Sequence, residues 1–222
     1  MTISYFVGNS LYLNITNKCT NDCVFCIRNF GDSLKLETDP PPEEIWNDIV
    51  QVRLNFDEIV FCGFGEPTIR LDDVILPLSK RLKETFSRPI RLNTNGHAGM
   101  LHPKRNIAKE LADSGIDKVS ISLNAEEAWL YNFLCKPKFI RNINDESVYR
   151  KLIQFIQECQ RQEGLITEVT VLRFPIEKMP EGIPPPDIER CKATADRLNV
   201  SFRVREYFGP HLYASILRKY SG

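Results

Sequence analysis

Apolar and polar residues alternate over six short segments of the chain, and these segments predict six β-strands. The six segments are rich in β-branched residues and cover residues 10–16, 58–62, 90–94, 118–123, 168–174 and 201–207. Helical patterns lie between them, over residues 41–54, 72–86, 103–114, 145–163 and 186–198. They begin with acidic residues or prolines, and the last three end at a glycine or an asparagine. The repeated strand–helix order predicts an α/β fold with a parallel sheet and helices outside.

The length of the chain limits how far such a sheet can close. A closed eight-unit barrel takes about 250 residues, whereas this chain has 222 residues and six predicted units. We therefore expect a partial (βα)6 TIM-like barrel. No linker or repeat divides it, so we expect a single domain over residues 1–222.

Polar residues follow one another along one face of several predicted strands. Val119, Ile121 and Leu123 alternate with Ser120, Ser122 and Asn124, so the apolar set should meet the helices. The same rule assigns further polar side chains to the inner face: Tyr12, Asn14, Thr16, Arg91, Asn93, Asn95, Arg203, Arg205 and Tyr207. A polar lining predicts a polar ligand inside the barrel, and the alternative is an open sheet face that meets water.

Composition and charge exclude several classes of protein. Lys plus Arg and Asp plus Glu both number 29, so the chain lacks the basic field of a general polyanion binder. No apolar run approaches the roughly 18 residues of a membrane span, and the N-terminus does not resemble a signal peptide. We expect a cytoplasmic protein without a membrane partner.

Three of the seven cysteines fall within eight positions. Cys19, Cys23 and Cys26 form a C-x-x-x-C-x-x-C motif just after the first predicted strand, at the carboxyl edge where parallel α/β folds keep their chemistry. A structural zinc site takes four ligands in paired sets, and no second C-x-x-C occurs. Three thiolates suit an iron–sulfur cluster with one open iron, and zinc is the alternative.

This motif, with Phe25 before its last cysteine, resembles that of the radical S-adenosylmethionine (radical SAM) enzymes. The resemblance implies that Cys19, Cys23 and Cys26 hold a [4Fe-4S] cluster whose fourth iron binds S-adenosylmethionine (SAM). It further implies one-electron cleavage of SAM to a 5′-deoxyadenosyl radical, which abstracts hydrogen from a substrate. A one-electron donor such as flavodoxin or ferredoxin is then required.

A second motif supports the resemblance. The segment CGFGEPT, residues 62–68, resembles the family's Gly-Gly-Glu-Pro loop, which implies that Gly63, Gly65 and Glu66 contact the methionyl ammonium. By the same resemblance, other polar residues at strand ends are candidate SAM contacts: Asn93, Asn95, Ser122, Asn124 and Arg173. Phe25 belongs to the same SAM-binding set.

Other residues suggest roles on the substrate side. Arg203 and Arg205 on the inner face, with the basic loop of Lys136, Lys138 and Arg141, indicate an anionic substrate, and a solvated charged rim is the equal alternative. Cys135 is expected on the rim beside Lys136 and Lys138, whose charges would lower its pKa and make it a candidate redox thiol. His97 lies in a loop, where we expect it to be exposed and without a role.

The whole pattern most resembles the TatD-linked radical SAM proteins, a group whose name describes a neighbouring nuclease rather than a reaction. A TatD-type nuclease is thus a candidate functional partner, and the substrate stays open. A glycyl-radical-enzyme activase and a 7-carboxy-7-deazaguanine synthase-like enzyme are alternative enzymes. A non-enzymatic iron–sulfur or zinc module that partners a nuclease is the alternative of another class.

Overall fold

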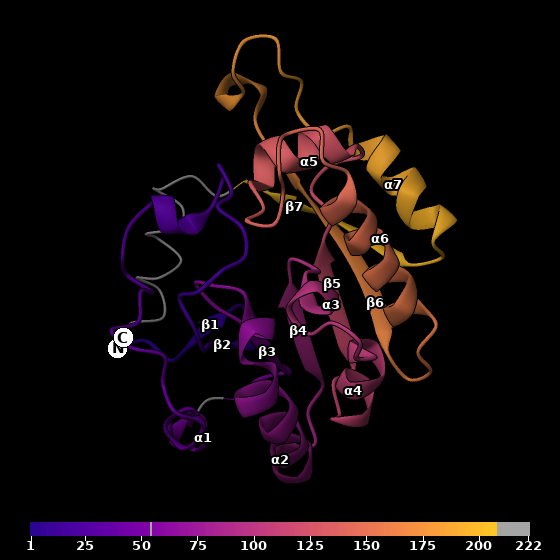
Figure 1. The fold of residues 1–222 in the computed structure, drawn as a ribbon. Coiled ribbons are helices and arrows are strands. Elements are labelled where there is room, and N and C mark those ends of the chain that lie inside the picture. The colour runs from indigo at the N-terminus through magenta and orange to yellow at the C-terminus, as the bar shows by residue number, and fades with distance from the viewer. Residues whose placement is uncertain (54, 208–222) are drawn as a thin grey trace.

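The computed structural model describes residues 1–53 and 55–207, and its centre is one curved sheet (Figure 1). Seven strands lie side by side in chain order: β1 (Ser4–Val7), β2 (Ser10–Asn14), β3 (Glu58–Cys62), β4 (Ile90–Thr94), β5 (Lys118–Ser122), β6 (Ile166–Arg173) and β7 (Ser201–Glu206). The pairs from β2 to β7 are all parallel. The predicted α/β fold with a partial (βα)6 barrel is confirmed. Residue 54 and residues 208–222, part of the predicted domain, lie outside the described residues.

Strand β1 lies outside the six predicted units. It pairs antiparallel with β2, and Val7 faces Ser10 across a two-residue turn. Gly8, in this turn, has a φ of 59°, which favours glycine because it has no Cβ. The sheet therefore begins with a hairpin before the βα repeats start.

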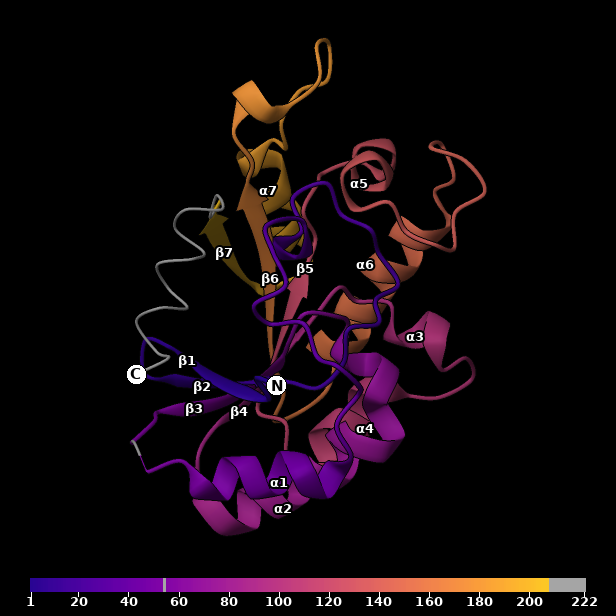
Figure 2. The same cartoon turned by 90° about the vertical axis from the view of Figure 1, so that its left-hand side faces the viewer.

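The larger helices lie along the outer, convex side of the sheet (Figure 2). The helices are α1 (Pro42–Gln51), α2 (Leu76–Phe86), α3 (Ala98–Leu101), α4 (Ile107–Asp113), α5 (Ala128–Cys135), α6 (Ser147–Gln160) and α7 (Ile188–Arg197). The predicted helix over residues 72–86 is divided, because a π-turn (Leu71–Ile75) precedes α2. Helices α3 and α5 were not predicted. Helix α5 reads AWLYNFLC, an apolar run with no helical stripe to reveal it.

The hydrophobic core fills the space between the sheet and these helices. On β2 and just after it, Leu11, Leu13 and Ile15 are completely buried, and on β5 the same holds for Val119 and Ile121. The apolar faces predicted from the alternation thus meet the helices. Full burial of each such side chain contributes roughly 1.5–3 kcal/mol to folding.

The inner face of the sheet is polar, as predicted, and its charges at the amino ends of the strands are paired. Arg91 donates to both carboxylate oxygens of Glu58, at 2.6 and 3.0 Å, and reaches Tyr12 Oη at 3.2 Å. We call this group the Glu58 network. Burial alone would raise the pKa of Glu58, but the hydrogen bonds from Arg91 and Ser10 outweigh it and lower the pKa.

A second group at the same end surrounds Glu168, and we call it the Glu168 network. Lys118, Ser120 and Arg203 donate to this carboxylate at 2.8, 2.7 and 3.0 Å. Burial of Glu168 would raise its pKa, yet the bonds from Arg203 and the other two donors bring the pKa down to about 2. Two acidic residues therefore balance the cations at the amino end of the inner face.

No helix within the described part of the chain combines the length and the apolar character that crossing a membrane requires.

Candidate active site

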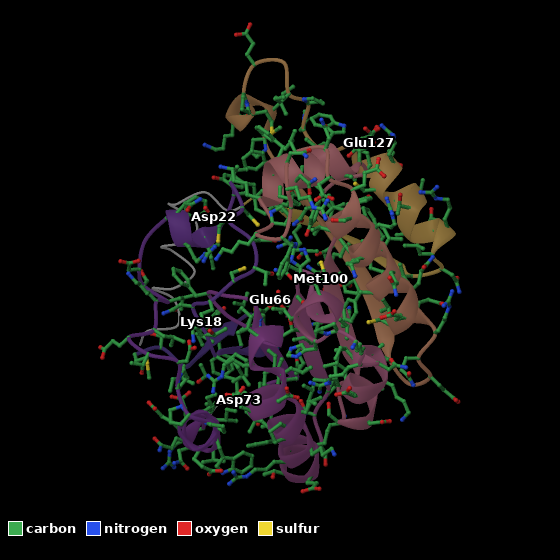
Figure 3. The ribbon with its side chains drawn as sticks, viewed as in Figure 1. Lys18, Asp22, Glu66, Asp73, Met100 and Glu127 are labelled. Atoms are coloured by element: carbon green, nitrogen blue, oxygen red, sulfur yellow. The ribbon has the colours of Figure 1, made fainter. Side chains whose placement is uncertain are left out.

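The three clustered cysteines lie on one loop after β2, residues 15–26, which we call the cysteine loop. Labels in Figure 3 mark Lys18 and Asp22 on this loop, and Glu66 lies toward the middle of the molecule. Lys18 carbonyl oxygen accepts from Glu66 N at 2.7 Å, and Ile15 carbonyl oxygen accepts from Arg70 Nη1 at 2.9 Å. The loop is thus fixed by segments from elsewhere in the chain.

Nitrogen donors point at two of the three sulfurs. Asn21 N lies 3.4 Å from Cys19 Sγ and Arg28 Nε lies 3.2 Å from Cys26 Sγ. All three thiols are free and partly exposed. N–H donors around sulfur are a feature that tunes thiolate-bound clusters. The donor set and its surroundings therefore fit three thiolate ligands of a cluster.

Burial, together with the negative charge of Glu66, raises the pKa of Cys19 to about 12, so this side chain is protonated. Within residues 1–53 and 55–207, no three Cys, His, Asp or Glu side chains converge closely enough to hold a metal ion. Iron binds cysteine as the thiolate, so binding of a cluster would displace the Cys19 proton.

The segment Cys62 to Thr68, which we call the glutamate loop, follows β3 and lies against the cysteine loop. Gly65 packs so closely that a Cβ there would lie 2.2 Å from Lys18 O and 2.6 Å from Thr16 O, so only glycine fits. Gly63 has a φ of 123°, which also favours glycine. Gly65 thus serves the contact between the two loops, and a Cβ at Gly63 would lie 2.8 Å from Asn14 Oδ1 at the end of β2.

Glu66 is buried, and its carboxylate joins the glutamate loop to the end of β4. Thr94 Oγ1 donates to Oε1 at 2.6 Å and Asn95 N donates to Oε2 at 2.7 Å. Thr68 donates twice more to Oε1. Burial raises the pKa of Glu66 although these bonds oppose the shift. Oε2 accepts one bond among the described residues and retains room for a second donor.

The two asparagines after β4 take different positions. The Asn95 side chain donates to Thr20 Oγ1 at 2.7 Å and lies 3.9 Å from Cys19 Sγ. Asn93 lies lower on the inner face, where it accepts from Arg91 at 2.8 Å. Of the pair, only Asn95 is brought to the cysteine loop.

His97 does not lie exposed in its loop, so that expectation was wrong. The ring is completely buried, with Nδ1 2.9 Å from Thr20 Oγ1 and Nε2 2.8 Å from Tyr131 Oη. Burial lowers the pKa of His97 to about 3, so the ring is neutral near pH 7. His97 therefore connects the cysteine loop to α5.

Arg205 and Asn124 meet at the carboxyl end of the inner face. Arg205 Nη2 donates to Asn124 Oδ1 at 3.0 Å, and Arg205 Nε is buried with no hydrogen-bond partner among the described residues. Burial lowers the pKa of Arg205, and the thiols of Cys62, Cys23 and Cys135 lie within electrostatic range. Arg203, unlike Arg205, belongs to the Glu168 network. Ser122 lies half-buried at the end of β5.

Arg173 lies away from this site, contrary to the expected contact with SAM. Its side chain is 57% exposed and pairs with Glu206 at 3.1 Å. Side chains alternate along a strand, so Arg173 and Glu206 point to the face opposite that of Glu168 and Arg205. The alternation of β6 could have excluded Arg173 from the inner face.

The rim position expected for Cys135 was also wrong. Cys135 ends α5 and is completely buried, 3.7 Å from Asn124 Nδ2. The missed helix α5 is the reason, because it turns this side chain into the core. Cys159 and Cys191 are buried as well.

Aromatic side chains gather beside the cysteine loop. Phe25 contacts Phe174 with ring centroids 5.8 Å apart, Phe174 contacts Tyr207 at 5.3 Å, and Tyr207 contacts Phe30 at 5.9 Å. Phe25 thus borders the site through an aromatic cluster rather than standing alone. No local pattern in the sequence predicts this grouping, because its members come from separate segments.

Comparison with known proteins identifies the family. Residues 13–162 match the model of the radical SAM superfamily. The chain belongs to the radical SAM superfamily. It is a radical SAM enzyme, and members of this family use a [4Fe-4S] cluster and SAM. The zinc site and the non-enzymatic module are accordingly set aside.

The region that matches this chain is only part of each curated relative. The chain is 32% identical over 123 residues to a probable GTP 3′,8-cyclase of Thermococcus kodakarensis, covering 55% of this chain and 37% of that protein. A probable GTP 3′,8-cyclase of Methanocaldococcus jannaschii is 33% identical over 129 residues, covering 57% and 40%. The chain thus spans less than half the length of these relatives.

A solved structure supports the fold. The structure of TYW1 with a lysine-pyruvate adduct bound has a TM-score of 0.58 and 15% identity, covering 90% of this chain and 65% of that one. At this identity the likeness concerns the partial barrel alone.

Proposed function

We propose that this radical SAM enzyme abstracts a hydrogen atom from a small anionic substrate held by Arg205. The observation that carries the proposal is the buried Arg205 Nε, which has no partner among the described residues. A buried guanidinium without a counter-charge is costly, and an anion that accepts from it would offset that cost.

The cofactor side of the proposal uses the residues around the cysteine loop. Cys19, Cys23 and Cys26 would hold the [4Fe-4S] cluster, which when bound supplies the electron that breaks a C–S bond of SAM. The glutamate loop, with Gly63 and Gly65 in close contact with the cysteine loop, would offer backbone groups and Glu66 Oε2 to the methionyl ammonium.

Polar side chains next to the loop complete the proposed SAM site. Asn95 lies beside Cys19, and Asn124 lies beside Arg205. We propose both, with Ser122, as hydrogen-bonding partners of SAM, and Phe25 as an apolar neighbour within the aromatic cluster. That cluster excludes water from one side of the site, which a radical reaction needs. Asn93 bonds to Arg91, so we propose for it an indirect role, namely orienting the inner face.

The substrate side rests on Arg205 and not on Arg203. Glu168 already balances Arg203, whereas the only hydrogen-bonding partner of Arg205 among the described residues is the neutral Asn124. Binding of an anion would therefore use a charge that the fold leaves uncompensated. Arg203 would act indirectly by fixing β7 against β5 and β6.

The names of the curated relatives suggest one candidate within the anionic class. GTP, which the name GTP 3′,8-cyclase mentions, is an anionic nucleotide. Because the chain spans less than half of those proteins, we include GTP as a test substrate and do not infer the cyclase reaction.

Four earlier interpretations stay predictions: the TatD-linked group, a TatD-type nuclease partner, the glycyl-radical-enzyme activase and the 7-carboxy-7-deazaguanine synthase-like reaction. None of the relatives described above carries these names. The activase would act on a partner protein, and the synthase-like enzyme on a small heterocycle. Both are distinguishable from an anionic substrate in the experiment that follows.

The test uses anaerobically reconstituted protein with dithionite as reductant. We expect SAM to yield 5′-deoxyadenosine slowly without substrate, and faster with the correct member of a panel of phosphorylated and carboxylated metabolites that includes GTP. Arg205→Met should keep iron content and SAM affinity while losing the stimulation by substrate. Arg203→Met is the matched control and should retain most of the stimulation.

Two outcomes would contradict the proposal. If Arg205→Met instead weakens SAM binding itself, the guanidinium binds the methionyl carboxylate and the argument for an anionic substrate falls. If only a partner protein or an uncharged heterocycle stimulates cleavage, one of the alternative reactions holds. Binding of SAM measured by calorimetry separates the first outcome from a loss of turnover.

A further inference from the structure

The loop that follows α5 carries three exposed cationic side chains. We call residues 136–143 the basic loop. Lys136, Lys138 and Arg141 are exposed, and none of them forms an ion pair within the described residues. The Asp145 carboxylate lies near and accepts from the backbone N–H groups of Arg141 and Ser147. Asp22, whose N–H donates to Lys136 O, also lies near, and its carboxylate pairs with Arg28. The loop therefore presents a net positive surface.

Apolar side chains lie among these cations. Phe139 is 42% exposed and Ile143 is 41% exposed. A hollow of about 310 Å³ lies in the same loop, lined among others by Lys136, Ile140, Arg141 and Ile143. Exposed aromatic and aliphatic groups within a rim of one charge are typical of surfaces that bind other proteins.

The basic loop is bonded directly to the cysteine loop. Asn21 and Pro137 form an antiparallel bridge, and Lys138 N donates to Thr20 O at 2.9 Å. Asp22 N donates to Cys135 O at 3.1 Å, so the basic loop begins beside the segment that carries Cys19 and Cys23. Figure 1 shows the end of α5 close to the indigo N-terminal segment. A protein docked on this loop lies next to the proposed cluster ligands.

We propose that the basic loop is the docking surface of an acidic one-electron carrier protein of the flavodoxin or ferredoxin type. This inference rests on the radical chemistry of the proposed function, which consumes one electron for each SAM cleaved. In the step at this surface the reduced carrier loses one electron and the cluster gains it, and no proton or group is transferred.

The size and charge of the surface favour such a carrier over a nucleic acid. Electron-transfer partners meet over small interfaces and are steered by opposite charge. Three cations with two exposed apolar side chains match that description. A nucleic-acid surface needs a longer basic stripe, and this chain has equal numbers of basic and acidic residues.

The test compares two charge-reversed proteins. The first carries Lys136→Glu, Lys138→Glu and Arg141→Glu. The matched control carries Arg53→Glu, Lys80→Glu and Arg88→Glu, exposed positions on helix α2 and near the amino ends of the strands. For each protein, formation of 5′-deoxyadenosine is measured against the concentration of reduced flavodoxin or ferredoxin, at several ionic strengths, and separately with dithionite.

We expect the basic-loop variant to raise the carrier concentration needed for half-maximal rate by about 10-fold or more and to flatten its dependence on salt. Its iron content and its rate with dithionite, which needs no docking surface, should match those of the control. Phe139→Ser should weaken docking by a smaller factor while leaving the salt dependence intact.

An unchanged carrier dependence in the basic-loop variant would overturn the proposal, and so would an equal loss in the control. Docking is also measured without turnover, by titrating the oxidised carrier into each protein and recording the dissociation constant. That measurement keeps its meaning if SAM is not cleaved even with dithionite, an outcome that counts against the proposed function rather than against the docking surface.

Discussion

The two ends of the inner face differ in how their arginine side chains are paired. At the amino ends of the strands, Arg91 and Arg203 lie against Glu58 and Glu168, with distances of 2.6 to 3.0 Å. At the carboxyl ends, Arg205 donates to the neutral Asn124 and forms no ion pair within the described residues. Two arginines only two positions apart on β7 thus differ in charge balance. We call the amino ends, where each arginine pairs with a carboxylate, the balanced end, and the carboxyl ends, where Arg205 lacks one, the unbalanced end. The difference indicates that the balanced end is structural, while the unbalanced end is where a ligand is expected.

The largest expected effect comes from removing a thiol at the unbalanced end. Cys19→Ala, Cys23→Ala and Cys26→Ala should each lose cluster assembly, about four irons per chain, and with it SAM cleavage. Iron content and absorbance after anaerobic reconstitution measure this. Cys159→Ala and Cys191→Ala are the controls, because these thiols are buried in the core and should leave iron binding unchanged. Intact iron binding in all three loop variants would refute the assignment of the ligands.

The next effect concerns stability at the balanced end. Arg91→Met leaves Glu58 partly buried without its partner and should lower the free energy of unfolding by about 3 kcal/mol. Urea unfolding of the metal-free protein provides the measurement. The double variant Arg91→Met/Glu58→Gln should recover part of the loss, since no charge is then left unpaired. A loss below 1 kcal/mol in the single variant would show that the Glu58 network is not structural.

A smaller effect depends on pH. The pKa of Glu168 is about 2 in the folded protein, below the ordinary value of 4.5, so its network stabilises above pH 4.5 and loses this contribution as the pH falls toward 2. Glu168→Gln should cost on the order of 2 kcal/mol at pH 7, a figure discounted for the exposure of Arg203 and Lys118. Urea unfolding at pH 7 and pH 3 should show the difference from wild type shrinking at pH 3. An equal difference at both pH values would argue against this linkage.

The smallest expected change in stability is at Arg205. Arg205→Met removes a half-buried charge that no described carboxylate balances, so the free energy of unfolding should change by less than about 1 kcal/mol or rise. The same urea experiment, run beside Arg91→Met, compares the two ends directly. A loss as large as that of Arg91→Met would mean that Arg205 is a structural residue, and the comparison between the two ends would fail.

The sequence predicted much of the fold because alternation and helix boundaries are local. The bounds of β3 and β4 match the predictions, and the polar inner face follows from alternation alone. The hairpin of β1 and helix α5 were missed. Helix α5 is buried on most sides, so its pattern shows no apolar stripe, and the position of Cys135 could not be foreseen without it.

Of the candidate site, the sequence identified residues but not partners. The cysteine motif and the glutamate loop do lie together, since Gly65 contacts the cysteine loop. The distinction between Arg203 and Arg205 depends on Glu168, which lies 35 residues before Arg203. Burial of His97 depends on Thr20 and Tyr131, both far from it in sequence. Such long-range pairs leave no local signal.

The way in which the cysteine loop is fixed has a consequence for the order of folding. Its bonds reach Glu66, Asn95 and Cys135, residues that leave the ribosome long after Cys26. Contacts this distant in sequence form late, because the intervening chain must first be ordered. A nascent chain therefore holds its three thiols on an unfixed loop until α5 has been made and docked. We therefore expect the cluster to be inserted late, after the sheet has assembled.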